Sequence, residues 1–128
     1  MDLIAYFADA KGLGILSTTG KDGKVNAAVY FKPYFLSETQ VAFLALEKLT
    51  HANLQENPYA HYLFKEDGSG YKGIRLVLRK IQESQDPEVI NNIQKVHFNV
   101  VVAKDAKEEK ASAIYFEIES EGPLIGSL

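Results

Sequence analysis

Short alternating runs of apolar and polar residues dominate this sequence and predict β-strands. Residues 14–19 and 25–31 flank a turn at residues 20–23, whose Asp-Gly step is typical of a tight hairpin. Residues 71–81 alternate cleanly, with Ile74, Leu76 and Leu78 on one face. Further strands are predicted over residues 41–46, 59–65, 98–103 and 112–119. Strands joined by short turns predict a mainly β fold, a barrel or sandwich built on antiparallel pairing.

The strand predicted over residues 41–46 differs from the others because every residue in it is apolar. Such a strand is expected to be buried on both faces. It leads into a short helix predicted over residues 50–57, which the Asn57-Pro58 step ends.

Two other helices are predicted. In the first, Leu3, Ile4 and Phe7 share one face, Asp2 caps the start and Gly12 marks the end. The other begins at residues 86–88, where Asp-Pro-Glu supplies a cap, a proline at the first helical position and an acid in the first turn. Residues 89, 90, 93 and 96 give it an apolar stripe, and the charged stretch 104–110 is interpreted as a loop.

Composition narrows the class of protein. A chain of 128 residues suits one domain, and the absence of cysteine excludes disulfides, thiolate nucleophiles and cysteine-bound zinc. Fourteen basic and seventeen acidic residues give a net charge of −3, which argues against a general nucleic-acid surface. No apolar run approaches the roughly 18 residues of a membrane span. No signal peptide is recognisable, so we expect a cytoplasmic protein.

The stretch most informative for function follows the apolar strand, at residues 46–58. Thr50 is predicted to cap the helix, with Leu49 and Leu54 as a hydrophobic staple. A helix N-terminus is electropositive, so this start, with Lys48 beside it, suits a phosphate group. The alternative, which the local sequence alone favours, is a well-capped helix that binds nothing.

Other chemistry is poorly represented. His51, His61 and His97 lack the spacing of a helical metal site, and no carboxylate cluster completes one, so no metal site is predicted. The serines lie in no nucleophile elbow, and catalytic residues stay unassigned.

The residues Lys72, Arg75, Arg79 and Lys80 make the predicted strand 71–81 locally basic. We interpret this strand as a solvated face, with binding of an anionic ligand across a subunit contact as the alternative. Aromatic residues at positions 30, 31, 34, 35, 43, 62 and 64 are expected to fill the core, and a few to line a planar ligand.

Taken in order, these segments resemble the family of split-barrel proteins that bind flavin mononucleotide (FMN) and are related to pyridoxamine 5′-phosphate oxidase. The likeness covers residues 3–81 and, less closely, the last two strands. It is carried by the opening helix, the strand 14–19, the Asp22-Gly23 hairpin, the strand beginning Val25-Asn26-Ala27-Ala28, and above all the run from Phe43 through Lys48-Leu49-Thr50 to Asn57-Pro58.

The resemblance implies one domain over residues 1–128, an antiparallel split β-barrel with peripheral helices, and a homodimer with FMN at its interface. The strand Asn26, Ala27, Ala28 and Val29 would run along the isoalloxazine ring. Phe43 and Leu44 would line the ring and ribityl chain, and the phosphate would bind at Lys48, Leu49 and Thr50. Lys72 and Gly73 complete the candidate cofactor-binding residues.

Two departures from the family qualify this expectation. Many members carry a basic pair at the positions of Leu49 and Thr50, which is missing here, so we expect Lys48 to substitute. The chain also ends before the substrate-binding C-terminal segment of the true oxidase and has no tryptophan. Oxidation of pyridoxamine phosphate is therefore not expected.

The function predicted at this point is that of an FMN-dependent oxidoreductase that transfers electrons or hydride. Its electron donor would be a reduced nicotinamide or a redox protein, and no nucleic-acid or membrane partner is expected. The alternative is a split barrel without redox chemistry that binds a deazaflavin, haem or a flavin for storage or sensing. A structural dimer that has lost its ligand is a third possibility.

Overall fold

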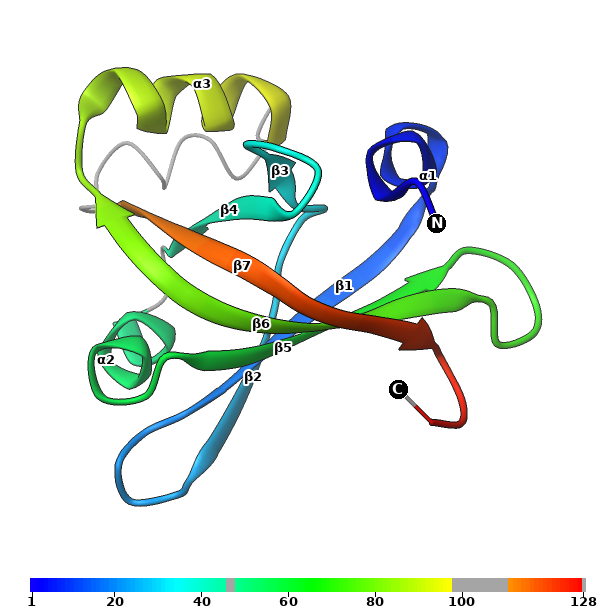
Figure 1. Ribbon diagram of the computed structural model, residues 1–128, viewed down its shortest axis with the longest axis horizontal. Coiled ribbons are helices and arrows are strands. Elements are labelled where there is room, and N and C mark those ends of the chain that lie inside the picture. Colours follow the sequence, from blue (N-terminus) through cyan, green and yellow to red (C-terminus); the bar gives the residue numbers. More distant parts are fainter. Residues whose placement is uncertain (46–47, 98–110, 128) are drawn as a thin grey trace.

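The computed structural model describes residues 1–45, 48–97 and 111–127, and most of its strands and helices follow the sequence pattern (Figure 1). The elements are α1 (Leu3–Asp9), β1 (Gly12–Thr19), β2 (Val25–Val29), β3 (Tyr34–Phe35), β4 (Gln40–Ala45), α2 (Lys48–Glu56), β5 (Tyr59–Glu66), β6 (Gly73–Ser84), α3 (Pro87–His97) and β7 (Ser112–Pro123). In the described residues, seven strands form one sheet in the order β2-β1-β5-β6-β7-β4-β3. All neighbouring strands pair antiparallel, so the predicted mainly β fold is confirmed.

The main core lies on the inner face of this sheet. Ile74, Leu76 and Leu78 of β6 are buried, whereas the residues between them are only partly covered, so the predicted alternation is confirmed. Tyr62 of β5 packs against Phe43 of β4, with ring centroids 5.0 Å apart. Burial of such large side chains is the main favourable contribution to folding, at roughly 1.5–3 kcal/mol each.

Strand β4 is buried on both faces, as its uninterrupted apolar run predicts. Val41 and Phe43 belong to the main core. Ala42 and Leu44 point the other way and pack with Ile93 of α3, which lies over β4 in Figure 1. The predicted start of α3 is confirmed as well, because the carboxylate of Asp86 accepts a hydrogen bond from the N–H of Glu88 at 2.9 Å.

Helix α1 ends earlier than predicted. It stops at Asp9, and Gly12 belongs to β1. Glycine is needed at position 12 because a Cβ there would lie 2.1 Å from the carbonyl oxygen of Lys65 on the neighbouring strand β5. The glycine that was predicted to end the helix therefore serves close strand pairing.

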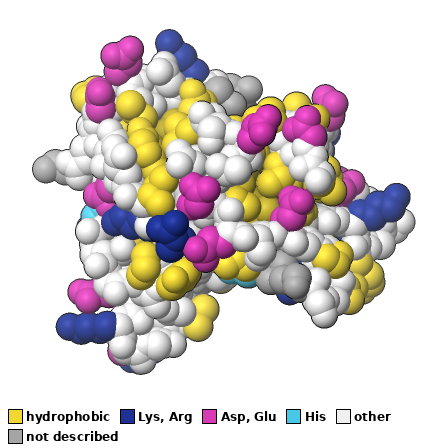
Figure 2. Space-filling model, in the orientation of Figure 1, with side chains coloured by type: hydrophobic (Ala, Val, Ile, Leu, Met, Phe, Trp, Pro, Cys, Tyr) yellow, Lys and Arg dark blue, Asp and Glu magenta, His cyan; other side chains and the backbone are white. Residues whose placement is uncertain are grey.

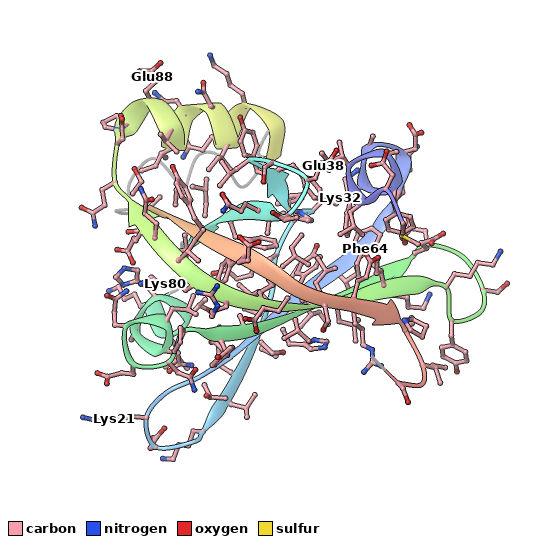
Figure 3. The ribbon with its side chains drawn as sticks, viewed as in Figure 1. Lys21, Lys32, Glu38, Phe64, Lys80 and Glu88 are labelled. Atoms are coloured by element: carbon pink, nitrogen blue, oxygen red, sulfur yellow. The ribbon has the colours of Figure 1, made fainter. Side chains whose placement is uncertain are left out.

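The packing of α1 also differs in one residue from the prediction. Leu3 and Phe7 are buried, and Asp2 caps the helix by accepting the N–H of Ala5, but Ile4 is 43% exposed. Figure 3 places Lys32 beside this helix. Its ammonium group donates to the carbonyl oxygens of residues 7 and 10, at the helix C-terminus, where a cation is favoured.

Three further predictions have different outcomes when they are compared with the structure. The turn at residues 67–70 is confirmed, and both of its glycines have positive φ. Strands β6 and β7 extend several residues beyond the predicted ends. The strand predicted over residues 98–103 and the loop predicted over residues 104–110 lie outside the described residues.

The close approach of β1 to Tyr62 supplies a first testable prediction. A Cβ on Gly14 would lie 2.0 Å from the Tyr62 hydroxyl and 2.5 Å from the carbonyl oxygen of Tyr30. Gly14→Ala is therefore expected to lower the free energy of unfolding by about 2 kcal/mol, measured by chemical denaturation. In a Tyr62→Leu background the loss should be smaller, because the hydroxyl and the ring carbon that lies 2.6 Å from this Cβ are both gone. Equal losses in the two backgrounds would contradict this explanation.

Candidate functional site

Helix α2 crosses the end of the β1–β2 hairpin and also contacts β4. It begins at Lys48, so the prediction that Thr50 caps it is wrong. Thr50 lies inside the first turn, is fully buried, and accepts a hydrogen bond from the side-chain amide of Asn26 at 3.2 Å. Leu49 is 50% exposed and Leu54 is buried, so these residues do not form the predicted staple.

Three side-chain hydrogen bonds join α2 to the hairpin. They pair Asn26 with Thr50 (3.2 Å), Asn53 with Thr18 (3.1 Å) and Asn57 with Thr19 (3.0 Å). Thr50 and Asn53 lie three positions apart on one face of α2, and Asn57 follows directly after the end of the helix. This polar stripe was visible in the sequence as a helical spacing, but its role emerges only with the partners on the hairpin. It fixes the start of α2 relative to β2.

A second polar cluster ties α2 to β6. Glu83 accepts hydrogen bonds from Gln55 (2.9 Å) and Lys80 (3.2 Å), and the ring nitrogen Nε2 of His51 lies 3.0 Å from its other oxygen. Figure 3 shows Lys80 between β6 and α2. Burial alone would raise the pKa of Glu83, but the hydrogen bonds from these three partners outweigh it and lower the pKa to about 2. Sequence reasoning missed this cluster, because its members are distant along the chain.

The first turn of α2 suits an anion. Lys48 and Leu49 are exposed, so the helix N-terminus reaches solvent beside β2. The dipole of the helix makes this end electropositive, and its first N–H groups point along the axis out of the helix. The Lys48 ammonium adds a full positive charge at the same end. These features can bind a phosphate group.

Strand β2 lies beside this helix start and is the first strand in the sheet order. One of its sides therefore carries main-chain groups that point away from β1. Asn26 and Ala28 are partly buried and face α2 and the core, whereas Ala27 and Val29 are exposed on the opposite face. The structure thus brings the predicted residues of β2 and the first turn of α2 together.

Phe43 and Leu44 are placed differently from the resemblance. Their side chains are 2% and 3% exposed, the first in the main core and the second beneath α3. In this chain their side chains are already surrounded by protein.

Lys72 and Gly73 lie toward the opposite ends of the strands from the start of α2. Gly73 pairs with Lys65, which pairs with Leu13 near the start of β1, whereas Asn26 pairs with Thr18 near its end. Five residues of strand separate the two ends, roughly 17 Å. A single chain therefore does not bring Lys72 or Gly73 to the start of α2. Gly73 also has a structural reason to be glycine, because a Cβ there would lie 2.0 Å from the carbonyl oxygen of Phe64.

The remaining basic residues of β6 have protein partners. Arg79 forms an ion pair with Glu119 at 3.0 Å, and Lys80 pairs with Glu83. Arg75 donates to the carbonyl oxygens of Pro123 and Gly126 near the end of the chain. Figure 2 accordingly shows basic and acidic side chains side by side near the middle of this face. This pairing fits the interpretation of a solvated, internally balanced strand.

The rest of the described chain offers little else. No group of three or more His, Asp or Glu side chains in it could hold a metal ion, and none of its helices is long and apolar enough to cross a membrane. A hollow of about 460 Å³ lies between the start of α1 and the β3–β4 turn, near the Glu38 of Figure 3 and away from α2.

No protein-family model matches the sequence, and no curated protein matches it significantly. Solved structures do match. An FMN-binding protein from Syntrophomonas wolfei has a TM-score of 0.77 at 20% identity, over 95% of this chain and 82% of that one. For a pyridoxamine 5′-phosphate oxidase-like protein from Listeria innocua the values are 0.67 and 16%, over 96% of each chain. For a protein named F420 reductase they are 0.68 and 14%, over 91% of this chain and 94% of that one.

The fold is that of the FMN-binding split barrels. The resemblance seen in the sequence is thereby confirmed at the level of the fold. In this split barrel the sheet order leaves β2 and β3 at its two ends, and α2 contacts both β2 and β4. The helix whose start suits a phosphate therefore contacts β2, at one end of the sheet, and β4, next to the other end.

The Glu83 cluster gives a pH-dependent prediction. The pKa of Glu83 is lower in the folded chain than its ordinary value of 4.5, so its stabilising contribution is complete above that pH and is lost as the pH falls toward 2. Glu83→Gln should therefore lower the free energy of unfolding at about pH 7 and have a much smaller effect at about pH 3, measured by urea denaturation. The exposed Glu38→Gln serves as the control. An equal deficit for Glu83→Gln at both pH values would contradict the assignment.

Proposed function

We propose that this chain is an FMN-binding flavoprotein that works as a homodimer and transfers electrons or hydride. The observation that carries the proposal is the fixed position of the α2 start against β2, in a fold shared with an FMN-binding protein. The phosphate would bind at the first turn of α2, and β2 would run along the isoalloxazine ring. Two independent arguments, from helix electrostatics and from the family resemblance of the sequence, thus support the same place.

The residues at the helix start fit a phosphate without the basic pair common in the family. Thr50 is buried and its hydroxyl accepts from Asn26, so this side chain serves to position the helix. Leu49 has no charge to offer. Lys48 is exposed at the first position of α2 and supplies a positive charge there.

A second copy of the chain completes the proposed site. We define the outer sheet face as the side chains that point away from the core on four strands: Val25, Ala27 and Val29 of β2, Leu13, Ile15, Ser17 and Thr19 of β1, Tyr59, His61, Leu63 and Lys65 of β5, and Arg75, Val77 and Arg79 of β6. Val25 and Val29 are 71% and 70% exposed, and the largely apolar part of this face on β2 and β1 is suited to burial against a partner. Lys72 and Gly73 would then reach the flavin from the second copy, since one chain cannot bring them there.

The chemistry would belong to the flavin, which transfers electrons or hydride when bound. This chain's residues would bind the phosphate, orient the ring along β2 and exclude water through the second copy. The electron donor would be a reduced nicotinamide or a redox protein. The cytoplasmic location expected from the sequence stays a prediction.

A second candidate is supported by one comparison. The likeness to a protein named F420 reductase favours a deazaflavin as the alternative ligand in the same place. Deazaflavins and flavins absorb at distinct wavelengths, so one spectrum separates the two candidates. Haem, and a flavin held only for storage or sensing, remain alternatives from the sequence.

The experiment that tests the proposal is an absorption spectrum of the purified protein, followed by heat release and identification of any bound chromophore. The expected result is FMN at about one molecule per chain, because the cofactor carries the chemistry and the protein binds and orients it. A deazaflavin would support the second candidate. A colourless protein that fails to bind added FMN would contradict both.

Lys48 supplies a further prediction. Lys48→Ala should weaken FMN binding by about tenfold, because it removes a charge from the phosphate site and leaves the buried contacts of α2 intact. Flavin fluorescence quenching measures the affinity. The exposed Lys95→Ala on α3 is the matched control and should bind like the wild type. The double variant Lys48→Ala with Thr50→Ala should lose more affinity than Lys48→Ala alone, and unchanged binding in it would contradict the phosphate assignment.

A further inference from the structure

The outer sheet face has one titratable imidazole near its centre. His61 on β5 pairs with Ser17 of β1 on one side and with Val77 of β6 on the other. Ser17 in turn pairs with Ala27 of β2. The four side chains therefore form a row across the face, because residues opposite each other on antiparallel strands point the same way.

The two rows beside that of His61 differ. One row places Val29, Ile15 and Leu63 next to one another and ends at Arg75. In the other, Val25 lies opposite Thr19 and Tyr59 opposite Arg79. His61 itself is partly buried in the single chain. A partner that covers this face would remove the rest of the imidazole from water.

The charges around His61 come from three strands. On its own strand, Lys65 and Tyr59 share the face; on β6, Arg75 and Arg79 flank Val77. The outer positions of β1 carry no charge. On β7, Glu119 is paired with Arg79 at 3.0 Å, and Glu117, opposite Arg79 in the register, accepts a hydrogen bond from the side-chain amide of Gln40 at 3.0 Å. Among the described residues, β1, β5 and β6 bring no carboxylate to this face.

We infer that His61 makes the self-association of this chain depend on pH: the dimer forms with a neutral imidazole and weakens when that imidazole is protonated. The inference rests on the homodimer of the proposed function and adds its regulation. In a two-fold dimer the same patch meets itself, so the second copy brings the same apolar and basic side chains. A protonated His61 would then be buried beside Arg75, and the carboxylates nearest this face, Glu117 and Glu119 on β7, already bond Gln40 and Arg79.

The electrostatics of the single chain already disfavour protonation of His61. Burial lowers the pKa of His61, and the positive charge of Arg75 lowers it further. Covering the face lowers it again, so the dimer binds fewer protons than two separate chains. By linkage, association is strongest above the pKa of His61 in the separate chain, which already lies below the ordinary value of 6.5, and weakens as the pH falls through it.

The test is sedimentation of the purified protein, with the ligand that it retains, over a concentration series at about pH 8 and about pH 5.5. The dissociation constant of the dimer should rise by several-fold at the lower pH, since each dimer carries two His61 side chains and each separate chain begins to bind a proton there. His61→Gln is neutral at both values and should associate equally well at both. His51→Gln, altered at α2 and not on this face, should keep the pH dependence of the wild type.

Results that differ from these expectations contradict either the role of His61 or the homodimer. A wild-type dimer equally tight at both pH values, or His61→Gln with the same dependence as the wild type, overturns the role of His61 and leaves the homodimer standing. A monomer at every pH overturns the homodimer itself and this inference with it.

If the dimer is too tight to dissociate by dilution, subunit exchange between two labelled samples replaces sedimentation. Wild-type exchange should then speed up at the lower pH and that of His61→Gln should not, whereas equal acceleration in both overturns the inference.

Discussion

The candidate site depends above all on how α2 is held against the β1–β2 hairpin. Only three side chains of the helix are buried, and two of them, Thr50 and Asn53, are polar. Buried polar groups are costly unless they are hydrogen-bonded, so the pairs Asn53–Thr18 and Asn26–Thr50 allow only a narrow range of helix positions. An apolar contact would tolerate sliding, whereas these bonds have direction. The start of α2 therefore stays beside β2, which is what a bound phosphate and ring would require.

Much of the fold was predictable because local patterns agree with the tertiary environment. The apolar run of β4 is buried on both faces, by the main core on one and by α3 on the other. Asp86 caps α3 at the position that the sequence indicates. The wrong predictions for Gly12 and Thr50 have a common cause. Gly12 was interpreted as a helix end but serves strand pairing, and Thr50 was interpreted as a cap but bonds a residue 24 positions away. A local pattern cannot distinguish these uses, because the deciding partner is distant in sequence.

The candidate site was predictable to a similar degree. The start of α2 was singled out by helix electrostatics, and the structure places Asn26, which the resemblance had named, beside it. The place of Lys72 and Gly73 depends on the register of β1, β5 and β6, which no single segment reveals. That register separates them from Asn26 within one chain. A site that includes both groups is therefore a site shared between two copies.

The central claim is that the start of α2 binds the phosphate of a flavin. It is tested most directly by comparing the affinity of the ligand-free protein for FMN with its affinity for riboflavin, which has the same ring but no phosphate. Phosphate contacts at a helix start with one lysine predict FMN binding that is tighter by about 10- to 100-fold. Equal affinities for the two flavins would contradict the account, because the phosphate would then contribute nothing to binding.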